Sequence, residues 1–303
     1  MIDFEEISID KKDEINSYLK SLPGINSEKS FATLFVWRKG YNIKYAIADG
    51  VLLLSSHLSG EDEYIGIILP KERSFNLKGA VNKIIGFFKD GFVLRLYDSG
   101  TVEMLNDTFP DRFVISENRN SFDYIYSTEK LIRLSGKKYH TKKNHINKFK
   151  KLYPDCKYER LSAADKDECT ALFDKWYSGK KDTDGLDSER EAICEMFGEF
   201  DSLNLIGGGL RTDGELVAFS FGERLNSDTA LIHFEHANND YIGSFTEINR
   251  CFLEREFADL KYVNREEDMG LPGLRQAKMS YKPEFFAKKF DAKLREPLKI
   301  IHG

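Results

Sequence analysis

Cysteine is scarce in this chain, and its spacing argues against two kinds of cysteine-based site. The four cysteines among 303 residues are scattered and form no C-x-x-C pair. We therefore expect neither a zinc site nor a disulfide framework. This cysteine usage is typical of a reducing cytoplasm, so we expect a cytoplasmic protein, either free or peripheral to the membrane.

Long apolar runs are also missing. The longest purely aliphatic run, Val51 to Leu54, is far too short to span a bilayer. The first residues are acidic and carry no apolar stretch, so we expect no signal peptide. Neither a P-loop nor a Rossmann glycine fingerprint occurs.

The charge balance is mild. The net charge of −5 and the pI of about 5.8 argue against a protein that coats nucleic acid with its whole surface, although a local basic patch is compatible with them. Hydrophobic residues make up 41%, and the 23 Phe and 14 Tyr argue against disorder. A length of 303 residues suggests two domains.

Hydrophobic periodicity and turn residues predict the same order of elements in both halves of the chain. The first half is expected to contain strands at 4–8, 43–48, 51–57, 64–69, 93–97 and near 113, and helices at 11–21, 28–38, 77–89 and near 102. The second half is expected to contain strands at 156–161, 203–211, 215–224, 229–237, 260–264 and 285–294, and helices at 164–177, 188–200, 247–258 and 273–279. Asp49-Gly50 and Thr212-Asp-Gly214 mark the hairpins.

This repeated order predicts an α/β fold with a mixed sheet in each half. Few α/β folds combine a strand, two helices, an antiparallel meander, and then helix, strand, helix and strand. The acyltransferase fold of the N-acetyltransferase superfamily, GNAT, is the best known of them. We therefore predict two tandem GNAT-like domains, at residues 1–133 and 154–303, joined by a basic connecting helix at 134–153.

Two stretches resemble a known family. One is Asn-Arg-Glu-Glu-Asp-Met-Gly-Leu-Pro-Gly-Leu-Arg-Gln-Ala-Lys-Met-Ser-Tyr-Lys-Pro, from Asn264 to Pro283. The other is Gly-Lys-Lys-Tyr-His-x-Lys-Lys-Asn-His-Ile, which begins at Gly136. Both resemble bacterial proteins related to the soluble C-terminal domain of phosphatidylglycerol lysyltransferase. The resemblance extends along most of the chain and implies tandem GNAT folds.

The connecting segment is strongly basic. It carries seven lysines and no acid before Asp155, and Ile146, Phe149 and Tyr153 recur at helical spacing. It is expected to hold an anion such as a CoA pyrophosphate, the acceptor end of an aminoacyl-tRNA or a lipid phosphate. The favoured substrate-binding residues are His140, Lys142 and Lys143. The alternative is a solvated face whose lysines serve solubility.

The position of a GNAT pyrophosphate loop, from Asn238 to Glu247, is poor in glycine. Only Gly243 is present, and Ser244 and Glu247 fit a capping box that would occupy the free N–H groups of the helix. Acetyl-CoA is therefore not a secure donor. No cofactor is predicted, and acyl-CoA or aminoacyl-tRNA would enter as donor substrate.

Polar residues on the strand at 229–237 are candidates for proton transfer. Alternation places His233 and Glu235 on one face and His236 on the other. Glu235 or His236 would take a proton from the attacking acceptor. The alternative is a set of polar residues on a half-buried strand whose hydrogen bonds are made within the protein and that have no catalytic role. No metal ligand set is evident, and Asp182 to Gly185 fails the calcium-loop pattern.

The Asn264–Pro283 stretch follows a buried strand, where open α/β sheets place their ligands. Arg275 and Lys278 share one helical face and are expected to polarise a carbonyl or grip a phosphate, with Asp268 orienting the nucleophile or pairing with Arg275. The remaining substrate-binding candidates are Asn264, Tyr281 and Lys282. The alternative is a salt-bridged loop that caps the helix.

These observations predict an enzyme: an acyl- or aminoacyltransferase that moves its group from an aminoacyl-tRNA or an acyl thioester to an amine or hydroxyl acceptor. Its partners would be a small-molecule or lipid-headgroup acceptor and the acceptor end of tRNA. The alternative function is a catalytically silent GNAT-like module that binds an anionic metabolite or lipid headgroup. Composition and spacing leave open the oligomeric state and which domain carries the site.

Overall fold

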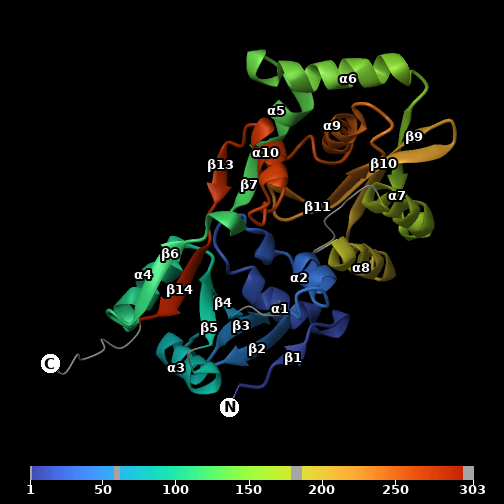
Figure 1. Ribbon diagram of the computed structural model, residues 1–303. Coiled ribbons are helices and arrows are strands. Elements are labelled where there is room, and N and C mark those ends of the chain that lie inside the picture. The colour runs from blue at the N-terminus through green and yellow to red at the C-terminus, as the bar shows by residue number, and fades with distance from the viewer. Residues whose placement is uncertain (1, 58–61, 90, 179–185, 296–303) are drawn as a thin grey trace. The chain divides into compact units, whose positions relative to one another are not determined.

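The computed structural model describes residues 2–57, 62–89, 91–178 and 186–295 (Figure 1). The chain divides into two compact units, each assembled from separated segments. Unit 1 is drawn from Met1–Gly24, Tyr41–Ser121 and Lys288–Gly303, and unit 2 from Ile25–Gly40 and Phe122–Ala287.

Unit 1 is built on a mixed seven-stranded sheet in the order β1-β2-β3-β4-β5-β14-β6. Its strands are β1 (Glu5–Glu6), β2 (Lys44–Ala48), β3 (Val51–Ser56), β4 (Glu63–Ile68), β5 (Phe92–Leu96), β6 (Phe113–Glu117) and β14 (Phe290–Leu294). Only β4 and β5 run parallel. The predicted hairpin at Asp49-Gly50 is confirmed, with φ values of 49° and 79° that a tight turn requires.

Three helices accompany this sheet: α1 (Lys12–Leu19), α3 (Leu77–Phe88) and α4 (Ser99–Thr108). The side chain of Asn76 caps α3 by accepting from Gly79 N, and Asp98 caps α4 by accepting from Thr101 N. The apolar face of α3 packs onto the sheet through Val81 and Ile84, which are fully buried. All three helices lie within or close to the predicted ranges.

Unit 2 contains a second mixed sheet, in the order β13-β7-β12-β11-β10-β9-β8. Its strands are β7 (Asp123–Ser127), β8 (Lys157–Leu161), β9 (Ile206–Thr212), β10 (Glu215–Arg224), β11 (Thr229–Ala237), β12 (Tyr262–Asn264) and β13 (Phe285–Ala287). Only β11 and β12 run parallel. The register of β10 against β11 slips beside His233, because Phe221 pairs with Phe234 and Gly222 with Ile232.

Seven α-helices belong to the described part of unit 2: α2 (Phe31–Trp37), α5 (Thr128–Arg133), α6 (His140–Leu152), α7 (Lys166–Ser178), α8 (Leu186–Gly198), α9 (Ser244–Glu256) and α10 (Pro272–Ser280). The predicted basic helix is confirmed as α6, which docks through buried Ile146 and Phe149. Helix α9 packs on the sheet, with Ile248, Phe252 and Leu253 in the core.

The closing strand predicted at 285–294 is wrong as a single element. It is two short strands in different sheets: β13 pairs with β7 in unit 2, whereas β14 lies between β5 and β6 in unit 1. Strand β7 and helix α5 were not predicted from the sequence. Strand β7 pairs with both β12 and β13, so its place depends on partners more than 130 residues away.

The compact units also divide the chain differently from the predicted domains. The predicted domains are continuous, whereas strand pairing carries β14 into unit 1 and packing against α8 places α2 in unit 2. Among the described residues, no helix combines the length and the apolar character needed to cross a membrane. The Asp182–Gly185 loop lies outside the described residues.

Candidate active site

The two parallel strands of unit 2 pair over a short stretch and then separate. Strand β11 pairs with β12 only from Thr229 to Leu231, although it continues to Ala237. The chain after β12 stays with β7 instead, since Arg265 N donates to Tyr124 O at 3.0 Å. The last six residues of β11 therefore have no parallel neighbour among the described residues. Carboxyl ends of parallel strands are where α/β sheets bind ligands.

The corresponding position in unit 1 is closed. Strands β4 and β5 stay paired over five positions, from Glu63 with Phe92 to Ile67 with Leu96. The Tyr97 hydroxyl fills the space beside β4, because a Cβ placed on Gly66 would lie only 2.3 Å from it. This comparison favours unit 2 as the unit that carries a site.

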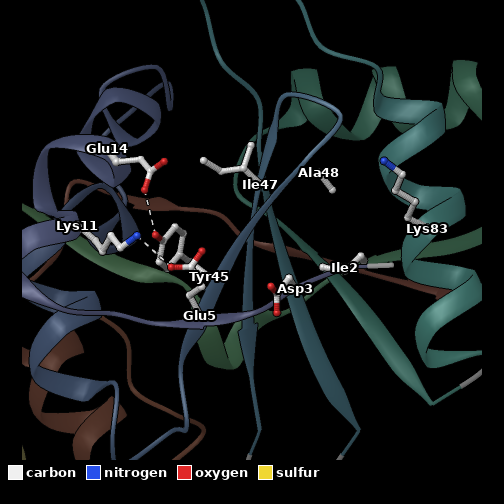
Figure 2. A pocket seen from close by; sticks show the side chains of 9 residues that line it. All are labelled: Ile2, Asp3, Glu5, Lys11, Glu14, Tyr45, Ile47, Ala48 and Lys83. Atoms are coloured by element: carbon white, nitrogen blue, oxygen red, sulfur yellow. Dashed lines mark hydrogen bonds and ion pairs between the residues drawn. The ribbon is translucent and has the colours of Figure 1, made fainter.

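Unit 1 does have one open pocket of about 290 Å³, lined by nine residues (Figure 2). Its polar side chains are largely engaged with one another. Lys11 Nζ lies 3.0 Å from Glu5, and the Tyr45 hydroxyl donates to Glu14 at 2.9 Å. Lys11 and Lys83 are paired with Glu5 and Asp49, whereas Glu14 accepts from a neutral phenol and Asp3 is exposed. The lining therefore carries net negative charge and does not suit an anionic ligand.

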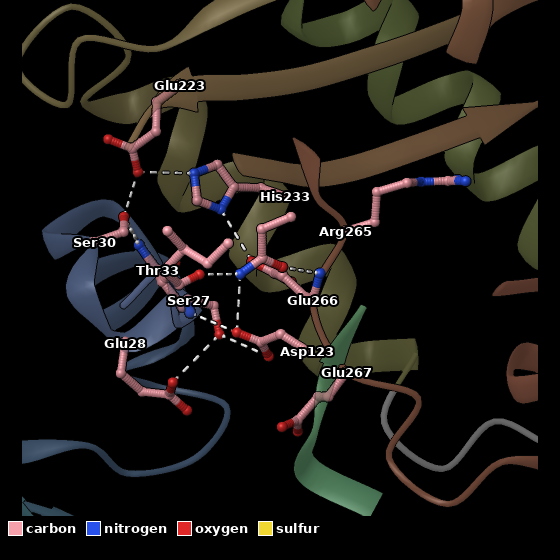
Figure 3. Close-up of polar contacts among 12 residues, drawn as sticks. Ser27, Glu28, Ser30, Thr33, Asp123, Glu223, His233, Arg265, Glu266 and Glu267 are labelled. Carbon is pink, nitrogen blue, oxygen red and sulfur yellow. Dashed lines mark hydrogen bonds and ion pairs between the residues drawn. The ribbon is translucent and has the colours of Figure 1, made fainter. Parts of the chain in front are cut away.

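The prediction that His233 and Glu235 share one face of their strand is wrong. The slip between β10 and β11 inserts His233 as an extra residue in β11, which is a β-bulge. His233 consequently contacts Glu223 and Glu266, whereas Glu235 contacts Arg265 and Asn249. Figure 3 shows the Arg265 side chain pointing away from the His233 ring.

Arg265 and Glu235 form a buried ion pair that bridges the separated strands. Arg265 Nη2 donates to Glu235 Oε1 at 2.7 Å, and their side chains are only 13% and 9% exposed. Asn249 of α9 donates to the other Glu235 oxygen at 3.0 Å. Arg265 Nη1 is buried and has no hydrogen-bond partner among the described residues. A buried N–H without a partner is costly, and a ligand oxygen is a natural acceptor for it.

A second cation lies beside this pair. Lys142 of α6 places Nζ 3.7 Å from the ring centroid of Tyr281, and the Arg265 guanidinium carbon lies 4.9 Å from the same ring. Burial and the positive charge of Arg265 together lower the pKa of Lys142 to about 8, and the negative charge of Glu235 offsets them only in part. Two cations and one carboxylate thus leave one unmatched positive charge, which suits an anion or a developing oxyanion.

The tyrosines of this cluster connect it to α10. The Tyr126 hydroxyl donates to Lys278 O at 2.9 Å, and the buried Tyr281 lies at the end of α10 with its hydroxyl 3.5 Å from Thr246 Oγ1. Burial raises the pKa of both phenols, so both are neutral hydrogen-bond donors at ordinary pH. We call Arg265, Glu235, Lys142, Tyr281 and Asn249 the arginine cluster.

Three of the predicted site residues therefore meet: Glu235, Lys142 and Tyr281. Arg265 and Asn249 were not predicted. Arg265 did lie in the stretch that the sequence marked, directly after a buried strand, and that position was the available signal. Asn249 had none, because it looks like any polar residue on a helix.

Other predicted residues hold the loop that carries Arg265. Lys278 Nζ donates to the main-chain oxygens of Arg265 and Glu267, and burial lowers its pKa to about 8. Asn264 is fully buried and donates to Ile25 O at 2.7 Å and to Asp123 at 2.9 Å. These side chains are fixed by protein groups and brace the loop.

Asp268 and Arg275 form a bidentate pair, which was one of the two roles predicted for Asp268. Arg275 Nε and Nη2 lie 2.8 and 2.7 Å from the carboxylate of the fully buried Asp268, and Tyr124 donates to it as well. Burial opposes its charge, but these bonds prevail and lower the pKa of Asp268 to about 2. Arg275 and Lys278 thus bind protein oxygens on different parts of the loop.

The remaining candidates lie elsewhere on the unit. His140, Lys143 and Lys282 are exposed. His236 points to the opposite side of β11, where Phe173 and Trp176 pack around it at ring distances of 4.9 and 4.7 Å. Its Nε2 lies 2.9 Å from Glu189. The histidine side chain is thereby separated from the arginine cluster.

The predicted capping box at Ser244 and Glu247 is wrong. Helix α9 begins at Ser244 itself, so the N-cap is Gly243, and the Ser244 hydroxyl donates to Asn238 O at 3.2 Å. Glu247 instead accepts from Arg250 at 2.7 Å. Gly243 has a φ of 93°, and a Cβ there would lie 2.4 Å from His145 O. The backbone of α6 therefore lies directly against this turn.

We accordingly expect no binding of a CoA diphosphate at the turn before α9. The turn is covered by α6, and the buried carboxylate of Glu247 adds negative charge beside it. Calorimetry with acetyl-CoA and with desulfo-CoA should give no saturable heat. Micromolar affinity for both would show that the diphosphate does bind and that α6 is displaced.

Comparisons with known proteins agree with this architecture. Residues 20–293 match the family model described as phosphatidylglycerol lysyltransferase, C-terminal. A conserved protein of unknown function from Bacteroides thetaiotaomicron is 32% identical, with a TM-score of 0.85 over 97% of this chain and 100% of that one. L-PGS from Bacillus licheniformis is 13% identical, with a TM-score of 0.62 over 94% and 92%.

FemX shares the fold at 11% identity, with a TM-score of 0.55 over 98% of both chains. An uncharacterized protein of Mycoplasmoides gallisepticum is 26% identical over 178 residues. The match covers 58% of the length of that curated relative. The predicted tandem GNAT-like fold and the predicted family are confirmed. The chain belongs to the phosphatidylglycerol lysyltransferase C-terminal family, a family of aminoacyl or acyl transferases.

Proposed function

We propose that this protein transfers an aminoacyl group from aminoacyl-tRNA to an amine or hydroxyl acceptor, and that the arginine cluster is its active site. The observation that carries the proposal is the unmatched positive charge of Arg265 and Lys142 in the arginine cluster, next to the residues of β11 that have no parallel neighbour among the described residues. An aminoacyl ester is favoured over an acyl thioester as donor, because α6 covers the turn that would receive a CoA diphosphate.

The chemistry follows from the groups present. The acceptor nitrogen or oxygen attacks the ester carbonyl, and a tetrahedral intermediate forms as the carbonyl oxygen becomes an anion. Arg265 Nη1 would donate to that oxygen, and the neighbouring Lys142 charge would stabilise it. Collapse of the intermediate breaks the ester C–O bond, and the ribose hydroxyl leaves with a proton.

Lys142 is the best-placed group to move that proton. Its low pKa of about 8 means that an appreciable neutral fraction exists near neutral pH, and a base with such a pKa is effective there. The neutral amine would take the proton from the attacking acceptor and return it to the leaving oxygen. Glu235 is the alternative acceptor, but its oxygens already accept from Arg265 and Asn249.

The direct test incubates the protein with tRNA charged with a mixture of labelled amino acids. Lipid extracts and water-soluble extracts of cells are supplied separately as acceptor pools, and acyl-CoA replaces the charged tRNA in a parallel set. The proposal expects label to move from tRNA to a compound in one pool. Transfer from acyl-CoA alone would reject the donor assignment. Binding of an extract component without any transfer would instead support the silent-module alternative.

The role of Lys142 makes a separate prediction. Replacing Lys142 with methionine should lower kcat by about 10²-fold and abolish the rise of kcat as pH increases through about 8. Lys142→Arg keeps the positive charge but cannot give up its proton, so it should lose the same limb of the pH profile. The matched control is Lys148→Met on the same helix, where the side chain is exposed and transfer should persist. An unchanged pH profile in Lys142→Met would reject the base assignment.

A further inference from the structure

His233 is a buried ionisable side chain near the arginine cluster, and no step of the proposed reaction uses it. Its side chain is 2% exposed, with Nε2 at 3.1 Å from Glu223 and Nδ1 at 3.2 Å from Glu266. Glu223 lies on β10, whereas Glu266 lies in the loop after β12, so the imidazole bridges the two (Figure 3). The same Glu223 oxygen accepts from Ser30, the N-cap of α2.

The loop that receives this contact is the one that presents Arg265. Glu266 follows Arg265 directly and has a φ of 53°, a left-handed conformation that a non-glycine residue rarely adopts. Such a conformation persists only where surrounding contacts enforce it. Here Glu266 N donates to Asn264 at 2.7 Å, Glu266 O accepts from Tyr124 N at 3.1 Å, and its carboxylate binds His233.

We propose that His233 is a positioning residue that, by binding Glu266, holds the 264–268 loop in the conformation that directs Arg265 toward Glu235. The bulge in β11 is what allows this arrangement, since it turns His233 toward Glu266 while Glu235 faces Arg265. The proposal rests on the proposed function only in treating Arg265 as part of the active site.

The bridge requires a protonated imidazole, because only then do both ring nitrogens donate. Burial disfavours the charge, but the hydrogen bonds to Glu223 and Glu266 outweigh it and raise the pKa of His233 to about 9. These two carboxylates are the charged groups that face the ring. The Ser30 hydroxyl binds one of them, and Arg265 points away. The pKa of His233 is higher in the folded protein than in the unfolded chain. The stabilisation that its two ion pairs give is therefore complete below about pH 6.5 and is lost as pH rises through about 9.

The experiment follows the geometry of Arg265 by NMR without using the reaction. The Arg265 ¹³Cζ and His233 ¹³Cε1 shifts would be measured from pH 6 to 10 in a Lys142→Met background, which removes one of the two lysines that titrate near pH 8 beside Arg265. The other, Lys278, binds Arg265 O and is followed by its own ¹³Cε shift in the same samples. We expect the two signals to titrate together with a midpoint near 9. In His233→Gln, the Arg265 signal should already have its high-pH shift at neutral pH.

His236→Gln is the matched control. His236 is also buried on β11 and also binds a glutamate, but it faces Phe173 and Trp176. This substitution should leave the Arg265 signal unchanged. If His233→Gln does not fold, Glu266→Gln removes the same ion pair from its other end and should shift the Arg265 signal in the same way. An Arg265 signal that ignores His233 titration, or that is unchanged in a folded His233→Gln variant, would overturn the proposal.

The transfer assay supplies a second readout. His233→Gln should lower kcat by about 10- to 100-fold with little change in KM. The reason is that Arg265 would be misplaced, and a displacement of a catalytic group by about 1 Å has an effect of that size. The two hypotheses fail separately. Absence of transfer by the wild type on every donor would reject the proposed function but not the NMR result. Normal transfer by His233→Gln would reject the positioning role alone.

Discussion

Replacing Arg265 with glutamine is expected to lower kcat for aminoacyl transfer by about 10²–10³-fold, the usual effect of removing one donor to an oxyanion. Arg265 Nη1 is buried and has no hydrogen-bond partner among the described residues. It is therefore free to donate to the substrate oxygen, and this bond would be strongest in the transition state, when that oxygen is an anion. The measurement is kcat and KM with charged tRNA and the acceptor pool that receives label. Arg265→Lys should recover only part of the loss, because an ammonium has a single nitrogen and cannot reproduce the planar two-nitrogen fork of a guanidinium.

Loss of folding must be separated from loss of chemistry in this test. The Glu235 carboxylate is nearly buried, and in Arg265→Gln it would keep Asn249 but lose its charged partner. The free energy of unfolding of this variant should therefore fall. The double variant Glu235→Gln/Arg265→Gln removes both charges and should melt close to the wild type while still lacking transfer. A folded double variant with wild-type kcat would reject Arg265 as a catalytic residue.

Replacing Arg275 with alanine is expected to reduce the free energy of unfolding clearly more than the loss of an exposed ion pair does. Arg275 is 36% exposed, but the carboxylate that it leaves without a charged partner is fully buried. The Asp268 carboxylate has no exposed surface, and Arg275 makes two hydrogen bonds to it. Chemical denaturation at neutral pH measures the effect. Tyr124 and Gly270 would remain as its hydrogen-bond donors, but neither carries charge.

Arg190→Ala is the matched control for this prediction. Arg190 binds Asp174 in the same two-point manner, at 2.7 and 3.0 Å, but both side chains are nearly half exposed. Its removal should change stability by only about 0–1 kcal/mol. Equal effects of the two substitutions would show that the Asp268 pair is no more than a surface contact.

The pH dependence of stability gives an independent check on Asp268. Its folded pKa is lowered to about 2 from 3.8, so the stabilisation is complete above about pH 4 and is lost as pH falls through about 2. In Arg275→Ala, much of this acid dependence should disappear, because the main partner of the carboxylate is gone. A parallel acid profile in both proteins would contradict the assignment.

Much of the fold is local in origin, which is why the sequence predicts it. The Asp49-Gly50 turn, the capped start of α3 and the docked face of α6 each depend on residues close together in the chain. Strand β7 is different. Its five residues pair with β12 and β13, so nothing in the vicinity of Asp123 to Ser127 specifies its position. The break between β13 and β14 has the same cause, because each half follows a different sheet.

The candidate site likewise has a part that the local sequence predicts and a part that depends on distant contacts. The stretch after Val263 is polar and follows a buried strand, and that alone marks the loop as a candidate for function. The residues within it could not be ranked from spacing. Arg275 and Lys278 share a helical face, yet one binds a buried carboxylate and the other binds main-chain oxygens. Their predicted role at a substrate carbonyl stays a prediction.

The sequence by itself determined the α/β class, the tandem order of elements, the family and the region of the site. These properties are written in periodicity, turn residues and short motifs, all of which act over a few neighbouring residues. Tertiary structure alone decided that Arg265, Glu235 and Lys142 meet, and that His233 and Glu235 face different ways. The physical reason is that a one-residue bulge in β11 and the separation of β11 from β12 are set by pairing between distant strands.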